Sequence, residues 1–161
     1  MTTGKRARKR ADGERGVALV EFALVLPFVA VVVFGVVDLG RAYTLQNRLR
    51  NAAREGARFA QFQPEQVQAG ASCPDPNNIA YAANHEEGTH TYTVVAQRWN
   101  GTAWVNLTGC KTPQDPTHTV QAGDRVRVRV SSSFTVLTPL ISAFVNNPIT
   151  ATGSDEIVVQ G

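Results

Sequence analysis

Glu21 is the only charged residue in the longest apolar run of this sequence, which extends from Val17 to Val37. An ionised carboxylate in a membrane helix is costly at the bilayer centre and less so near the interface, and it is usually retained for a partner. One interpretation is an interfacial acid whose charge reaches the lipid headgroups. The other is a carboxylate that pairs with a cation held at a fixed position.

The residue before the apolar run suggests where such a cation could come from. If the chain were cut after Gly16, Val17 would carry a free α-ammonium group, and Glu21 would be the fifth residue of the shortened chain. In a bundle of parallel helices staggered along their axes, the amine of one subunit could then neutralise the carboxylate of its neighbour. If the chain is not cut, the interfacial interpretation holds.

The apolar run has the length and the flanking charges of a membrane span. Its 21 residues would form a helix about 31 Å long, which matches one hydrocarbon core. Residues 1–16 hold six basic and two acidic residues, whereas the other 145 residues hold ten basic and eleven acidic ones. Because basic flanks stay on the cytoplasmic side, we predict a cytoplasmic tail and an extracytoplasmic domain after Asp38.

Two other interpretations of the apolar run fit less well. A secretory signal peptide would have a shorter apolar region, and a small-residue cleavage site of the A-x-A type would follow it. A buried core helix is disfavoured because nothing downstream in the sequence is large enough to bury 21 apolar residues. The segment is therefore predicted to remain as a single membrane anchor.

Two strings in this region resemble the TadE-like family of tight-adherence (Flp) pilus proteins. The first is RGVALVEFAL, from Arg15 to Leu24, and the second is NAAREGARFA, from Asn51 to Ala60. The matching positions between them are Pro27, Gly35, Asp38, Gly40, Arg41 and Ala42. A short basic leader that ends in Gly, followed by an apolar helix with Glu at its fifth position, is also similar to the class III signal of type IV pilins and pseudopilins.

The resemblance implies a pseudopilin or minor pilin, a structural component of Flp pilus assembly and cell adhesion. It implies cleavage by an inner-membrane prepilin peptidase, with Gly16 before the cut, Val17 as the new N-terminus and Glu21 as the assembly carboxylate. The implied partners are the lipid bilayer, the prepilin peptidase, other pilins and pseudopilins, and the Tad secretion machinery. The implied location is the bacterial cytoplasmic membrane, crossed once with the C-terminal domain outside, or the pilus and cell surface.

The helix is predicted to continue beyond the membrane, because small or apolar residues recur at helical spacing. They are Leu39, Ala42, Leu45, Leu49, Ala52, Ala53, Gly56, Ala57 and Ala60. We expect this stripe to pack on a small domain, and a free coiled-coil stalk is the alternative. The predicted organisation is a basic leader (1–16), a transmembrane helix (17–38), its extracytoplasmic continuation (39–60) and a β-rich domain (61–161). Pro27 is expected to kink the helix, because its ring removes a backbone donor.

The first part of the β-rich domain contains a hairpin signal. Thr91–Trp99 and Thr102–Leu107 are rich in β-forming residues and are joined by Asn100-Gly101. Before them, Asn78–Asn84 is expected to form one or two helical turns. These patterns predict a β-hairpin that follows a short helix.

Two further strands are predicted nearer the C-terminus. Arg and Val alternate from Arg125 to Val130, which indicates a strand with one buried and one solvated face, and this strand is expected to continue to Leu137. Ile149–Val159 supplies the last strand, with an interruption expected at Gly153-Ser154. The predicted fold class is α+β: a long N-terminal transmembrane helix that continues into a small antiparallel β domain, as in a pilin.

Cys73 and Cys110 both lie in the part of the chain predicted to be extracytoplasmic. Two cysteines in an oxidising compartment favour a disulfide. Such a bridge would tie the irregular segment after the helix to the end of the hairpin. Two free thiols are the alternative.

The sequence offers little support for catalysis. His85 and His90 flank the string H-E-E-G-T-H, in which the histidines are five residues apart, whereas the zinc-protease motif H-E-x-x-H needs four. The sequence has no G-x-S-x-G motif, no Walker-type loop and no paired catalytic carboxylates. We therefore expect no enzymatic activity, no cofactor, no metal, no nucleic acid and no small-molecule substrate.

A second function remains open at this stage. The protein could be a single-pass membrane-anchored binding module whose leader is never removed. Alternating arginines at Arg125, Arg127 and Arg129 could then bind an acidic ligand, although such a strand is more often the solvated face of a sheet.

Overall fold

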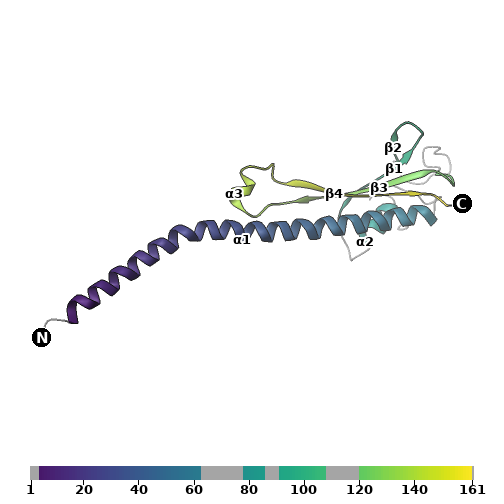
Figure 1. The fold of residues 1–161 in the computed structure, drawn as a ribbon. Coiled ribbons are helices and arrows are strands. Elements are labelled where there is room, and N and C mark those ends of the chain that lie inside the picture. Colours follow the sequence, from purple (N-terminus) through teal and green to yellow (C-terminus); the bar gives the residue numbers. More distant parts are fainter. Residues whose placement is uncertain (1–3, 63–77, 86–90, 108–119, 161) are drawn as a thin grey trace. The chain divides into compact units, whose positions relative to one another are not determined.

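The computed structural model describes residues 4–62, 78–85, 91–107 and 120–160 (Figure 1). In chain order the elements are α1 (Gly4–Phe62), α2 (Ile79–His85), β1 (Thr93–Trp99), β2 (Trp104–Asn106), β3 (Arg125–Phe134), α3 (Pro139–Ser142) and β4 (Ile149–Val158). A long helix followed by a small antiparallel sheet confirms the predicted α+β class. The chain forms two compact units, Met1–Gly40 with Val136–Asn146 and Arg41–Thr135 with Asn147–Gly161.

Helix α1 combines the apolar run and the small-residue stripe in one element of 59 residues. It begins at Gly4, so the backbone of most of the basic leader is helical as well. Pro27 lies inside the helix, where its ring removes one backbone hydrogen bond. The ribbon of α1 changes direction in its purple-to-blue part, which is the part that contains Pro27 (Figure 1).

The apolar part of α1 is open to its surroundings. By length and composition the helix can cross a membrane, and none of its most apolar window is buried within the protein. Leu19, Phe22 and Phe28 are 69%, 63% and 75% exposed. An apolar surface of this extent needs lipid or protein around it rather than water.

The second unit is built on a four-stranded antiparallel sheet in the order β2-β1-β3-β4. Strand β3 is central, and it pairs with β4 from Arg125↔Val158 to Phe134↔Ile149 and with β1 along six residues. Val126, Val128 and Val130 are fully buried, whereas the arginines between them lie on the opposite face. The alternation in the sequence therefore marks the two faces of the sheet, as predicted.

The core of this unit lies between the sheet and the small-residue stripe of α1. Leu49, Ala52, Ala53, Ala57 and Ala60 are all buried, and they cluster with residues of α2 and of the sheet. A Cβ atom at Gly56 would lie 3.1 Å from Val128 Cγ1 and 3.3 Å from Ile79 Cγ2. Small residues are required here because the sheet and α2 approach the helix closely, so the packed-helix prediction is confirmed over this stretch.

The interruption expected at Gly153-Ser154 was wrong, because β4 runs unbroken through both residues. Gly153 is buried, and a Cβ atom there would lie 2.4 Å from the carbonyl carbon of Leu49 and 2.5 Å from its oxygen. Gln46 Nε2 on α1 donates a hydrogen bond of 3.0 Å to the carbonyl of the neighbouring Thr152. The glycine therefore lets the strand approach the helix backbone closely, a common reason for glycine inside a strand.

The hairpin loop is longer than the Asn-Gly signal suggested. Trp99 pairs with Trp104, so the loop comprises the four residues Asn100–Ala103. Asn100 Oδ1 accepts hydrogen bonds from the amides of Thr102 and Ala103 at 2.9 and 2.8 Å, and Gly101 has a positive φ of 96°. The asparagine side chain thus forms the turn itself, a local interaction that Asn favours in loops.

Candidate functional site

The predicted processing and assembly residues lie on the exposed part of α1. Gly16, Val17 and Glu21 are all exposed and helical. Val17 and Glu21 are four residues apart, so their side chains share one face of the helix. The face that carries Glu21 is therefore accessible to another helix or to lipid.

A second polar site lies where the apolar run ends, and it involves Asp38. Asp38 is only 6% exposed, although it follows directly after the exposed Val36 and Val37. Its carboxylate accepts hydrogen bonds from the amide of Leu137 at 3.1 Å, from the amide of Thr138 at 2.9 Å and from Thr138 Oγ1 at 2.7 Å. Asp38 thereby holds the segment between β3 and β4 against α1.

The same contact starts the short helix α3. The carbonyl of Thr138 accepts a hydrogen bond from the amide of Ser142 at 2.9 Å, which closes the first turn. The first amides of a helix have no partner within it, and an acidic side chain is a favoured acceptor for them. Here the acceptor comes from α1, about one hundred residues earlier in the sequence.

Asp38 shows how a carboxylate is accommodated beside an apolar segment. Hydrogen bonds to a charged acceptor are stronger than neutral ones, and three donor groups converge on this carboxylate. Thr138, which supplies two of them, is 1% exposed. In the sequence Asp38 stood out only as a position of the family resemblance, and its partner could not be found from local patterns. The available signal was an acid at the end of an apolar run.

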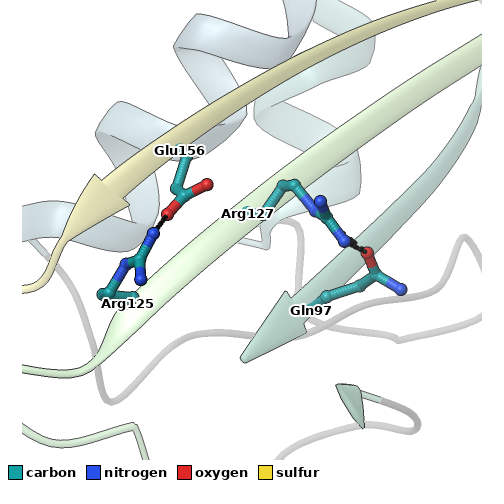
Figure 2. A network of polar contacts seen from close by, with 4 residues as sticks. All are labelled: Gln97, Arg125, Arg127 and Glu156. Carbon is teal, nitrogen blue, oxygen red and sulfur yellow. Dashed lines mark hydrogen bonds and ion pairs between the residues drawn. The ribbon is translucent and has the colours of Figure 1, made fainter. Parts of the chain in front are cut away.

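Two arginine side chains of strand β3 contact side chains of the neighbouring strands on the surface of the sheet (Figure 2). Arg127 donates to Gln97 Oε1 at 2.9 and 3.2 Å, and its guanidinium lies 4.2 Å from the ring centroid of Trp104. Arg125 forms an ion pair with Glu156 of the adjacent strand. These two side chains are held by their neighbours, which favours the solvated-face interpretation over an acidic-ligand site.

The remaining sequence candidates give no site in the described part of the chain. Cys73 and Cys110 lie outside the described residues, so the disulfide stays a prediction. His85 ends α2 with its ring stacked on Tyr81, and the rest of the H-E-E-G-T-H string is also outside the described residues. Among the described residues no group of three His, Cys, Asp or Glu side chains could hold a metal ion.

In the comparison with known proteins, one region of the chain matches a protein family. Residues 16–58 match the model of a family described as TadE-like protein. Over these residues, which lie within helix α1, the chain is similar to TadE-like proteins. The match confirms the resemblance drawn from the two sequence strings, and the TadE-like segment contains Gly16, Val17, Glu21 and Asp38. No curated protein and no solved structure matches the chain.

Proposed function

We propose that this protein is a TadE-like pseudopilin or minor pilin, a membrane-anchored structural component of Flp pilus assembly. The observation that carries the proposal is the contrast between two parts of one TadE-like helix. Large apolar side chains are exposed from Val17 to Val37, whereas the stripe from Leu49 to Ala60 is buried under a small sheet. A helix with these two parts suits a protein that is anchored in a bilayer and carries a folded domain outside it.

The proposed maturation step is hydrolysis of the peptide bond between Gly16 and Val17 by a prepilin peptidase. A peptidase needs a locally extended backbone, so the helix must unwind around the bond. Glycine in a helix interior costs about 1 kcal/mol relative to alanine, and Gly13 and Gly16 both lie in this part of α1. The two glycines would therefore ease unwinding where the cut is proposed.

The proposed assembly step uses the products of that cut. The new amine of Val17 would pair with Glu21 of a neighbouring subunit when the helices pack side by side. Both residues are exposed on the same face of α1, so a neighbouring helix can reach them. In a medium without water, such a pair compensates two charges that would each be costly alone.

The proposed topology follows from the charges. The basic leader would stay in the cytoplasm, α1 would cross the cytoplasmic membrane once, and the domain from residue 61 to 161 would lie outside. A Cys73–Cys110 disulfide would form in that oxidising compartment. The proposed partners are the bilayer, the prepilin peptidase, other pilins and the Tad secretion machinery, and the proposed role is structural rather than catalytic.

The decisive experiment is the intact mass and N-terminal sequence of the protein purified from its native membrane. An N-terminus at Val17 supports processing, whereas a retained leader would refute it and favour the permanently anchored binding module. Glu21→Gln removes the charge while keeping the side-chain shape, and we expect it to be processed but lost from assembled pili. Glu14→Gln is the matched control, because it removes a carboxylate from the leader, and we expect normal assembly.

A further inference from the structure

The segment between β3 and β4 exposes three large apolar side chains. Within residues 136–146, Leu137 is 62% exposed, Phe144 is 85% exposed and Val145 is 37% exposed. This segment belongs to the same compact unit as the apolar part of α1. The segment therefore lies in the same unit as the exposed apolar surface of the candidate membrane span.

Two contacts fix this segment at the end of that span. The first is the set of hydrogen bonds from Leu137 and Thr138 to Asp38. The second is Ile141, whose Cδ1 would lie 3.8 Å from a Cβ atom on Gly35. Gly35 precedes Asp38 by three residues, which is about 4.5 Å along a helix axis. The segment thus turns back toward the apolar run after its attachment at Asp38.

Five backbone amides of the segment donate hydrogen bonds within the unit. The amide of Ser142 donates to Thr138 O at 2.9 Å, and the amides of Phe144 and Val145 donate to Ile141 O at 3.0 and 3.2 Å. Together with the two amides bound to Asp38, these donors are paired inside the unit. Chain segments near hydrocarbon need such internal pairing, because lipid tails accept no hydrogen bonds.

We propose that residues 136–146 form a membrane-docking turn that inserts into the boundary between headgroups and acyl chains beside the outer end of the span. The occupant of its apolar surface is the phospholipid bilayer, into which Leu137, Phe144 and Val145 project. Amphipathic segments at this boundary bury their apolar face about 5–10 Å deep. The inference rests on the membrane anchor of the proposed function.

The turn would give the protein a second attachment to the membrane surface besides the span. Asp38 would then have a defined role, which is to hold the turn at the depth where its apolar side chains meet lipid. A charged residue at that depth is tolerated because the donors of the turn itself compensate it.

Photo-crosslinking in native membranes tests the docking turn. The full chain is produced with p-benzoylphenylalanine in place of Phe144, a conservative exchange at a side chain that is 85% exposed. Two control positions carry the same probe: Val33 inside the span and Thr102 in the loop between β1 and β2. After irradiation, mass spectrometry of the purified protein distinguishes phospholipid adducts from protein adducts.

We expect lipid adducts at positions 144 and 33, and none above background at position 102. Lipid adducts at 33 but not at 144, or a protein adduct at 144 in their place, would overturn the docking turn and leave the membrane anchor intact. Lipid adducts at 102 as abundant as at 144 would overturn it too, because the turn would then show no preference for lipid. Absence of lipid adducts at 33 would instead refute the membrane anchor itself, and the docking turn with it.

Discussion

Gly153→Ala provides the sharpest test of how the sheet packs on α1. The added Cβ atom would lie 2.4 Å from the carbonyl carbon and 2.6 Å from the next backbone nitrogen, both on the helix around Leu49. Real Cβ contacts do not come this close, and a helix backbone cannot rotate away as a side chain can. Overpacking of a core typically costs 1–3 kcal/mol, so we expect a loss of about 3 kcal/mol in the free energy of unfolding.

Two glycines of α1, Gly56 and Gly40, give a graded comparison for the Gly153→Ala substitution in β4. A Cβ atom at Gly56 would meet Val128 Cγ1 at 3.1 Å, and that side chain can yield by a few tenths of an ångström. At Gly40 nothing lies within 4 Å. Alanine is favoured over glycine in a helix by up to about 1 kcal/mol, so Gly40→Ala should be neutral or stabilising. Gly56→Ala should fall between the two extremes.

The assay is thermal unfolding of the full chain in detergent, followed by tryptophan fluorescence. The chain has two tryptophans, and both lie in the sheet, at Trp99 and Trp104, so the signal reports on the unit under test. For a domain of this size, about 3 kcal/mol corresponds to a midpoint lowered by roughly 10 °C. An unchanged midpoint for Gly153→Ala, or the same midpoint for all three variants, would refute the close approach of β4 to the helix.

Three further predictions concern other parts of the molecule. Asp38→Asn weakens the charged hydrogen bonds to Thr138, so we expect faster amide hydrogen exchange at that residue in detergent, with unchanged exchange in the central sheet. Asn100→Ala removes the acceptor of two loop amides and should cost about 1 kcal/mol in tryptophan-detected unfolding; an unaltered stability would show that the turn forms without it. If Cys73 and Cys110 are bridged, the protein purified without reductant will resist thiol alkylation under denaturing conditions and become alkylated twice after reduction, whereas two labels before reduction would disprove the bridge.

The elements of this fold were predictable wherever one face of an element is buried. Alternation of Arg and Val marked β3, and the spacing of small residues marked the packed half of α1, because both patterns repeat with the period of the structure. The ends of elements were less predictable. Strand β3 stops at Phe134 instead of the predicted Leu137, because its pairing with β4 ends there, at Ile149, the first residue of β4.

The features that escaped prediction depend on contacts between distant parts of the sequence. Gly153 looks like a strand interruption when read alone, and only the helix backbone opposite it explains why the strand continues. Asp38 and Thr138 are one hundred residues apart, so no local period connects them. Gly16, Val17 and Glu21 are predictions of the opposite kind, because their signal is a short string in a recognisable charge and apolar context.

The two halves of α1 use side-chain size for different purposes. From Leu49 to Ala60 small residues face the core, and close backbone approach to the sheet and α2 leaves no room for larger ones. From Val17 to Val37 large apolar residues dominate, and the described part of the chain buries none of the span's most apolar window. The half from Leu49 to Ala60 is thus buried within one chain, whereas the half from Val17 to Val37 needs an apolar environment from outside the chain.

Asp38 lies just after the exposed apolar half, and its hydrogen bonds hold the exposed apolar segment 136–146 at this end of the apolar run. These polar contacts therefore place a second exposed apolar segment in the same compact unit as the apolar run, and an apolar surface of this kind suits anchoring in a bilayer.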